Sequence, residues 1–205
     1  MFDKPVMIIT GTRKSIGKYL AEYYANKEFQ VVGCSRGDID FELDNYQHYC
    51  LDVSDESSVK KMFTEIRKNY GRLDVLINNA GIASMNHVLL TPLKEVHDIL
   101  NTNFVGTFLC CREAVKLMKR NKSGRIVNIS SIHVPLATVG TSIYGASKAS
   151  IEQFSRILAR EVFQFGININ ILALSVVKSS GMADVLSDDI TLKILICFRF
   201  YLKQY

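Results

Sequence analysis

The feature that most constrains the fold of this chain is a regular alternation of short apolar runs with longer segments of helical period. Buried parallel strands are short runs rich in valine and isoleucine, whereas helices on a sheet repeat apolar residues at three- and four-residue spacing. The apolar runs predict six strands: Val6–Thr10, Gln30–Cys34, His48–Leu51, Val75–Asn78, Arg125–Ile129 and Asn168–Ala173. The helical segments are Ile16–Asn26, Glu56–Tyr70, Leu93–Arg120 and Tyr144–Phe165.

This order of elements predicts an α/β fold, a three-layer, doubly wound parallel sheet of about six strands with helices on both faces. We expect residues 1–189 to form a single domain and residues 190–205 an atypical tail, because 205 residues suit one large core and not two. In such sheets the ligand crevice lies outside the carboxyl ends of the strands. Functional residues are therefore expected directly after each strand.

Composition and charge argue against several classes of protein. The net charge of +5 is modest and the basic residues are scattered, so no nucleic-acid partner is expected. No uncharged apolar stretch reaches the roughly 18 residues of a spanning helix, so no integral membrane segment is expected. The five cysteines form no C-x-x-C pair, which indicates reduced thiols, a cytoplasmic protein and no metal site. A basic pocket for a small phosphate-bearing ligand fits this charge better.

A glycine-bearing turn, TGTRKSIG at positions 10–17, follows the first predicted strand and runs into a helix. Such a turn lets the backbone approach a pyrophosphate, while the helix N-terminus offers free N–H groups and a partial positive charge. The plainer alternative is a tight strand-to-helix connection without a ligand. The candidate cofactor-binding residues in this turn are Gly11, Arg13, Lys14, Ser15, Ile16 and Gly17.

The end of the second strand indicates which coenzyme the chain prefers. NAD-binding members of such folds present a carboxylate there to the ribose 2′-hydroxyl. This chain has Ser35 and Arg36 instead, and a guanidinium pairs with a 2′-phosphate as a planar fork. With Lys14 adding charge on the same side, the pattern favours NADP(H). Asp38 lies close enough to leave NAD as an alternative coenzyme. The plainer interpretation is that Arg36 and Lys14 are solvated charges that bind no ligand.

The segment richest in chemistry combines Ser130 and Ser131, after the fifth strand, with Tyr144 and Lys148 at the start of a long helix. Residues four apart share one helix face, so the ammonium is expected near the phenol oxygen. A free tyrosine has a pKa of roughly 10, which is high for acid–base catalysis near neutrality. A neighbouring cation and an oxidised nicotinamide both favour the phenolate and would lower this pKa. By itself, a tyrosine and a lysine four residues apart are more often structural, with the tyrosine at the edge of the core and the lysine ammonium in solvent.

Between residue 6 and about residue 170 these motifs together resemble the short-chain dehydrogenase/reductase family, in its NADP-preferring form. The family's T-G-x-x-x-G-I-G turn is met except that Ser15 replaces the middle glycine, and its N-N-A-G motif is met in full at positions 78–81. The resemblance implies further residues beside the cofactor: Asp52, Val53, Asn79, Ala80 and Gly81. An aspartate after a strand is, however, as often a helix cap.

The same resemblance implies four catalytic residues: Asn103, Ser131, Tyr144 and Lys148. Ser131 would bind the substrate oxygen, with Ser130 as the nearby alternative, and Asn103 would hold a water in a proton relay with Lys148. Tyr144 and Lys148 would also contact the cofactor. Simpler roles are a turn cap for Ser131 and an ordinary polar helix residue for Asn103. His133 and Val134 are expected to line the substrate pocket, although a surface histidine is the default.

The implied activity is hydride transfer between NADP(H) and a small carbonyl or alcohol substrate, with Tyr144 as the proton donor. The C-terminal region departs from the family, because NILALS at positions 170–175 replaces the usual N-x-x-x-P-G. The resemblance implies that Val177 and Ser179 still occupy places that contact the cofactor. The apolar and basic tail beyond Asp189 favours packing on a partner subunit in a homo-oligomer, with a peripheral membrane contact as the alternative. The departure leaves open a catalytically impaired dinucleotide-binding protein that acts in binding or assembly.

Overall fold

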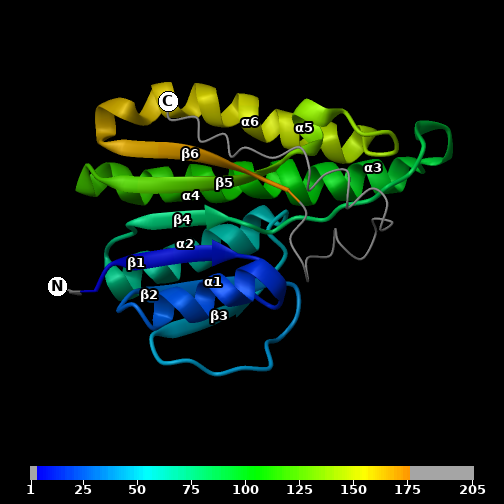
Figure 1. Ribbon diagram of the computed structural model, residues 1–205. Coiled ribbons are helices and arrows are strands. Elements are labelled where there is room, and N and C mark those ends of the chain that lie inside the picture. The colour runs from blue at the N-terminus through cyan, green and yellow to red at the C-terminus, as the bar shows by residue number, and fades with distance from the viewer. Residues whose placement is uncertain (1–3, 176–205) are drawn as a thin grey trace.

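The computed structural model describes residues 4–175, and within them six parallel strands form one sheet in the order β3-β2-β1-β4-β5-β6 (Figure 1). The strands are β1 Val6–Thr10, β2 Gln30–Ser35, β3 Tyr46–Cys50, β4 Val75–Asn78, β5 Gly124–Ser131 and β6 Ile167–Leu174. The order reverses between β1 and β4, which is the switch point where doubly wound sheets bind their ligands. The predicted Rossmann-type sheet is confirmed.

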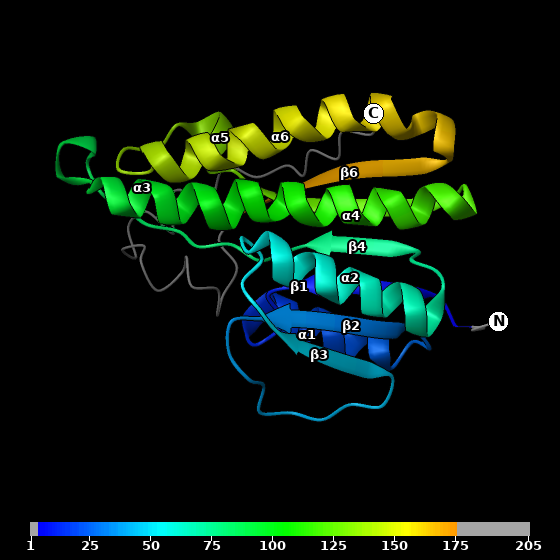
Figure 2. The same cartoon turned by 180° about the vertical axis from the view of Figure 1, so that it is seen from behind.

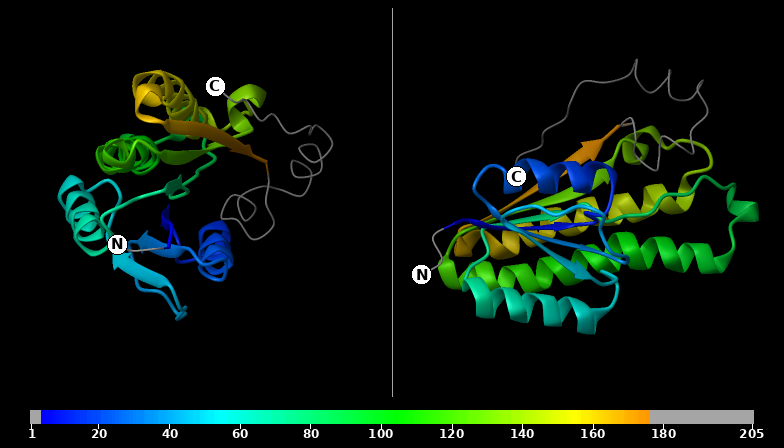
Figure 3. Two further views of the ribbon diagram at one scale, coloured as in Figure 1. Left: turned by 90° about the vertical axis from the view of Figure 1, so that its left-hand side faces the viewer. Right: turned by 90° about the horizontal axis from the view of Figure 1, so that it is seen from below.

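Helices cover both faces of this sheet, as predicted, but unequally within residues 4–175. The helices α2 (Glu56–Tyr70), α4 (Gly106–Asn121) and α6 (Ser142–Val162) lie side by side on one face (Figure 2). Their apolar residues form the larger core with Ile8, Leu76 and other strand residues. Helix α1 (Ser15–Ala25) covers the β1 and β2 side of the other face, where Ala21 and Ala25 pack on Met7 and Val31 (Figure 3).

The predicted helix Leu93–Arg120 is interrupted in the structure. It divides into α3 (Leu93–Leu100), the π-helical turn η2 (Asn101–Val105) and α4. A π turn adds a residue to the helical repeat and is common at functional sites. It places Asn103 in the interior, with none of the side chain exposed. The spacing of apolar residues could not predict the π turn, because the turn moves the apolar positions that follow it by only one residue.

The remaining differences concern the ends of elements and three short helical turns. Strand β5 extends through Ser130 and Ser131, which were expected after the strand, and β6 continues to Leu174, one of the two positions where the expected motif has proline and glycine. The short helix α5 (His133–Leu136) and the 3-10 turns η1 (Val88–Leu90) and η3 (Phe163–Phe165) were not predicted as separate elements. Val177, Ser179 and the tail at 190–205 lie outside the described residues.

Candidate active site

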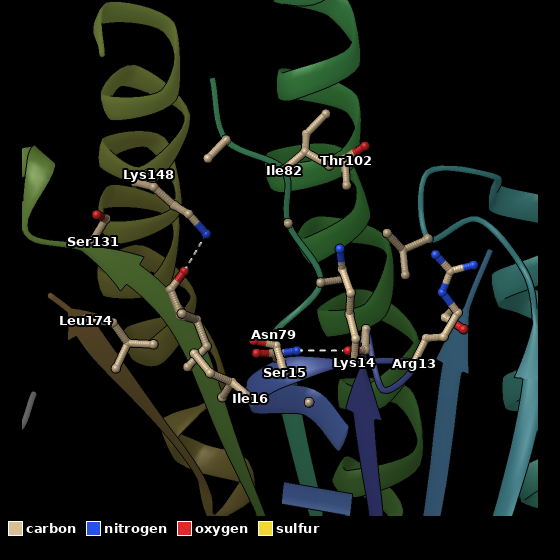
Figure 4. Close-up of a pocket in the computed structure, with 18 of the residues that line it drawn as sticks. Arg13, Lys14, Ser15, Ile16, Asn79, Ile82, Thr102, Ser131, Lys148 and Leu174 are labelled. Atoms are coloured by element: carbon tan, nitrogen blue, oxygen red, sulfur yellow. Dashed lines mark hydrogen bonds between the residues drawn. The ribbon is translucent and has the colours of Figure 1, made fainter. Parts of the chain in front are cut away.

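A cleft of about 610 Å³ runs along the carboxyl ends of the strands, where the sequence predicted the functional residues. The predicted residues that line it are Gly11, Arg13, Lys14, Ser15, Ile16, Gly17, Ser35, Arg36, Asp52, Val53, Asn79, Ala80, Gly81, Ser131, Tyr144 and Lys148. Lys148 and Ser131 lie on one side of the cleft and Arg13 on the other, with Lys14 between them (Figure 4). The fold therefore brings together residues more than a hundred positions apart.

The glycine turn has little space and an unusual backbone. A Cβ added at Gly17 would lie 2.1 Å from Gly11 O, so only glycine fits where the helix starts against the turn. Asn79 fastens this turn to the end of β4, since its Nδ2 donates to Thr10 O (2.9 Å) and Gly11 O (3.2 Å). Ser15, in place of the family's glycine, has a φ of +57°. A left-handed backbone costs a residue with a Cβ about 1 kcal/mol.

The basic side chains at the other end of the cleft come from two neighbouring segments. Arg13 and Lys14 follow Gly11 in the glycine turn, Arg36 follows β2, and all three are exposed. A Cβ added at Gly37 would lie 2.6 Å from Arg13 Nη1, so the Arg13 guanidinium rests on the backbone beside Arg36. Asp38, which had kept NAD open, is not among the residues that line the cleft.

Asp52 and Val53 border the cleft between these basic residues and β4. The Asp52 carboxylate accepts hydrogen bonds from Ser54 N (2.8 Å) and Ser54 Oγ (2.7 Å), so it stabilises its own turn. The cap of α2 is Asp55, whose carboxylate accepts from the N–H groups of Ser57 and Ser58. Asp52 is therefore a turn-stabilising residue at the wall of the cleft and not the helix cap.

Tyr144 and Lys148 project from successive turns of α6 into the opposite end of the cleft. Lys148 is 4% exposed, its Nζ donates to Ile129 O at 2.9 Å, and it lies 5.8 Å from the centre of the Tyr144 ring. A hydrogen bond joins Tyr144 and Ser131. Ser130 points elsewhere, since its Oγ donates to Glu152 Oε1 (2.8 Å). Of the two serine candidates, Ser131 is the one at the phenol.

Burial shifts the pKa of both groups against their charged forms. It raises the pKa of Tyr144, and the hydrogen bond with Ser131 opposes that rise. It lowers the pKa of Lys148 to about 8. The amine alone therefore does not lower the pKa of the phenol, and the part of the expected shift that an oxidised nicotinamide would supply stays a prediction. At 5.8 Å from the ring centre, the ammonium does not overcome the cost of a phenolate in a dry site.

Asn103 lies behind the cleft, where the π turn aims its side chain at the loop after β4. Its Oδ1 accepts from Ile82 N (2.8 Å), and its Nδ2 donates to Ile82 O (2.9 Å) and Ser147 Oγ (2.9 Å). A Cβ added at Gly81 would lie 3.2 Å from Asn103 Oδ1 and 3.5 Å from Lys148 Nζ. Asn103 thus joins three elements next to Lys148, which an ordinary polar helix residue does not do.

Comparison with known proteins agrees with this arrangement. The family model described as short chain dehydrogenase matches residues 5–190. The chain belongs to the short-chain dehydrogenase family. It is 34% identical over 190 residues to carbonyl reductase family member 4 of Xenopus laevis, covering 90% of this chain and 80% of the relative.

Further relatives of this short-chain dehydrogenase have similar coverage. The 3-oxoacyl-[acyl-carrier-protein] reductase FabG of Escherichia coli K12 is 31% identical over 194 residues, which are 92% of this chain and 79% of FabG. The solved structure of ElxO with NADP bound superposes with a TM-score of 0.83 at 33% identity, covering 88% of this chain and 77% of that one. Members of this family are oxidoreductases, which makes a dinucleotide cofactor and hydride transfer the chemistry to test against the cleft.

Sequence reasoning missed several residues that line the cleft of this dehydrogenase: Cys34, Gly37, Leu51, Ile82, Ala83, Thr102, Ile129, Ile132, Leu174 and Ser175. The sequence does not indicate that the apolar ones line the cleft, because the same apolar residue types occur at the end of a buried strand whether the side chain faces the core or the cleft. Leu174 accepts a hydrogen bond from Ile132 N at 3.0 Å, so β6 stays paired with β5 up to the cleft. Leu174 and Ser175, which stand where the expected family motif has proline and glycine, therefore form part of this wall.

His133 lies at the cleft, as expected, and the default of a surface histidine is wrong. It is 3% exposed, and its ring meets Tyr144 edge to face with centroids 5.9 Å apart. Its Nδ1 lies 3.0 Å from Thr138 Oγ1, and burial lowers its pKa. The neighbouring Val134 is half-buried and does not line the cleft.

Residues 4–175 lack two kinds of feature. None of the helices there is long and apolar enough to cross a membrane. No group of three or more histidine, cysteine or acidic side chains in this part of the chain could hold a metal ion.

Proposed function

We propose that this short-chain dehydrogenase transfers hydride between NADP(H) and a small carbonyl or alcohol substrate, with Tyr144 as the acid–base group. The observation that carries the proposal is that Tyr144, Ser131 and Lys148 share one cleft with the basic residues Arg13 and Arg36. Carbonyl reductase, 3-oxoacyl reductase and NADP-bound ElxO among its relatives support this substrate and coenzyme class.

The residues present fit a dinucleotide phosphate. At the glycine turn there is no room for a side chain at Gly17, and the N-terminus of α1 begins there, where a pyrophosphate would be bound by a helix N-terminus. Arg13, Lys14 and Arg36 would hold the 2′-phosphate, because a dianion on a ribose is best paired by guanidinium and ammonium donors. Lys148 would donate to the nicotinamide ribose hydroxyls. When bound, the reduced nicotinamide supplies the hydride.

The chain's own residues would manage the proton and the developing charge. Ser131 and Tyr144 would donate hydrogen bonds to the carbonyl oxygen, which gains negative charge as its carbon is reduced. Because burial raises the pKa of Tyr144, the phenol keeps its proton until that charge has formed and then donates it. The Lys148 ammonium, with its lowered pKa, would stabilise the resulting phenolate and pass it a new proton. Oxidation of an alcohol follows the reverse order.

Two measurements on the same samples test the proposal. NADPH fluorescence titration gives the dissociation constant, and loss of NADPH absorbance over a panel of ketones, aldehydes and 3-oxoacyl thioesters gives turnover. Tyr144→Phe should bind NADPH as wild type does and lose turnover by about a thousandfold, whereas Tyr23→Phe on exposed α1 should keep both. Retained turnover in Tyr144→Phe would refute the acid–base assignment.

The alternative role in binding or assembly has one specific observation in its favour, the left-handed Ser15 in the phosphate turn. The same panel separates the two proposals. NADPH binding by wild type without turnover of any carbonyl or alcohol selects the alternative. The expected small-molecule substrate, homo-oligomer and cytoplasmic location are likewise proposals, for which size-exclusion chromatography and localisation of a tagged chain are the tests.

A further inference from the structure

A connected set of polar side chains lies beneath the basic end of the cleft, outside the groups that the proposed function uses. Tyr46 Oη lies 2.8 Å from Thr12 Oγ1 and 2.9 Å from His48 Nδ1. On the other side of the imidazole, His48 Nε2 lies 3.0 Å from Ser35 Oγ, and Ser35 donates to Gly37 O at 2.7 Å. We call Thr12, Tyr46, His48, Ser35 and Gly37 the phosphate-arm network.

The hydrogen bonds determine the state of the imidazole. Ser35 uses its single hydroxyl proton on Gly37 O, so it can only accept from His48 Nε2, which must carry a proton. The same Nε2 lies 3.3 Å from Gly37 O, a second acceptor. Burial lowers the pKa of His48, which favours the neutral ring. Nδ1 stays 2.9 Å from Tyr46 Oη, whose own proton goes to Thr12 Oγ1. The imidazole therefore joins Tyr46 to Ser35 in one orientation.

The network crosses from β3 over β2 to the glycine turn at Gly33, where there is no side chain in the way. His48 on β3 is paired with Gly33 on β2. A Cβ added at Gly33 would lie 2.0 Å from Tyr46 Oη and 2.5 Å from Thr12 Oγ1, so the absent side chain is what lets β3 reach the glycine turn. A glycine inside a buried strand commonly marks such a close approach. The Tyr46 and His48 rings also stack, with centroids 6.1 Å apart.

The two ends of the network lie next to the two arginines, Arg13 and Arg36, whose side chains we call the Arg13 and Arg36 arms. Thr12 precedes Arg13, and Ser35 and Gly37 flank Arg36. The backbone joins the two segments through Cys34 O, which accepts from Gly11 N (2.8 Å) and Thr12 N (3.2 Å). Beyond Cys34, the network links Thr12 to Ser35 and Gly37, in addition to the contact of the Arg13 guanidinium with Gly37.

We propose that His48 is a positioning residue for the coenzyme 2′-phosphate, acting through the network to hold the Arg13 and Arg36 arms at a set separation. The inference rests on the proposed NADP(H) preference. Exposed arginines lose side-chain entropy when they bind a phosphate, and a rigid support reduces that cost. NADH lacks the phosphate, so its binding does not depend on this separation.

The test compares NADPH and NADH dissociation constants by fluorescence titration. His48→Phe keeps a stacked ring and removes both nitrogens, and Tyr46→Phe removes only the central hydroxyl. Each should raise the NADPH constant by about tenfold and the NADH constant by less than about twofold. The double variant should lose about as much as one single variant, because either break disconnects the network. His48→Gln, whose amide can still donate to Ser35, should recover part of the affinity.

His97→Phe is the matched control, since His97 is exposed on α3 and should leave both constants unchanged. Equal losses for both coenzymes, an unchanged NADPH constant, or additive losses in the double variant would each overturn the inference. If His48→Phe fails to fold, as judged by circular dichroism, Tyr46→Phe decides. A wild type that binds NADH as tightly as NADPH refutes the coenzyme proposal instead, so the two failures are distinguishable.

Discussion

The two ends of the cleft hold their functional groups by opposite means. At the catalytic end Ser131, Lys148 and Asn103 are each less than 5% exposed, and hydrogen bonds from β5, α6 and the loop after β4 hold them. At the nucleotide end Arg13, Lys14 and Arg36 are exposed, and order is supplied from below by uncharged side chains. Burial at the catalytic end shifts the pKa values of Tyr144 and Lys148, whereas the three basic side chains at the other end stay exposed to water.

The largest effect should come from the buried amine. Lys148→Met keeps most of the side-chain volume and removes the ammonium, so turnover should fall by about a thousandfold. Steady-state kinetics with a substrate found in the panel measures this, and kcat should fall more than KM rises. Lys94→Met, on the exposed surface of α3, is the control and should keep full activity. Activity above a tenth of wild type would show that the catalytic end does not depend on its buried charge.

The same lysine should also affect stability as a function of pH. Its folded-state pKa of about 8 lies below the ordinary 10.5, so between these values the unfolded chain binds more protons. The free energy of unfolding should therefore rise with pH, by about 2 kcal/mol between about pH 8 and pH 10. Above about pH 10 the raised pKa of Tyr144 acts in the opposite direction. Urea denaturation of wild type and Lys148→Met gives the difference, and parallel pH curves would contradict the prediction.

Substitutions at the nucleotide end should change the affinity for the coenzyme and not the stability of the fold. Arg36→Asp replaces a phosphate donor with a repelling carboxylate, so the NADPH dissociation constant should rise by about thirtyfold, the effect of losing one charge-assisted hydrogen bond. The NADH constant should change by less than about threefold. Arg67→Asp on exposed α2 reverses the same charge away from the cleft and controls for net charge. Equal losses for both coenzymes would remove the argument for NADP.

The smallest effect concerns the backbone of the phosphate turn. Ser15→Gly should raise the free energy of unfolding by about 1 kcal/mol, because glycine adopts a φ of +57° without strain. Ser15→Ala keeps the Cβ and should give no such gain. Urea denaturation measures both variants. A stabilised alanine variant would show that the hydroxyl, and not the backbone conformation, is the source of the cost.

Local patterns in the sequence were enough for the sheet and the position of the cleft. Val6–Thr10 and Val75–Asn78 were predicted to the residue, because a buried parallel strand needs a short apolar run whatever surrounds it. The glycine turn and the N-N-A-G turn were predicted from their own short motifs. Each turn has a backbone conformation that only a few residue types can adopt. Parallel strands then bring their carboxyl ends to one edge, which predicts where the cleft lies. The roles of Asn103 and Ser131 were predicted only through the resemblance to the short-chain dehydrogenase/reductase family.

The sequence by itself therefore determined the order of strands and helices, the glycine turn and the residues that meet at the edge of the sheet. Only the tertiary structure decided that Ser131 and not Ser130 meets Tyr144, that His133 is buried against it, and that the pKa of the phenol rises. Periodicity and backbone demands are properties of short segments. Side-chain direction and desolvation depend on every element packed around a group, so they exist only once the chain has folded.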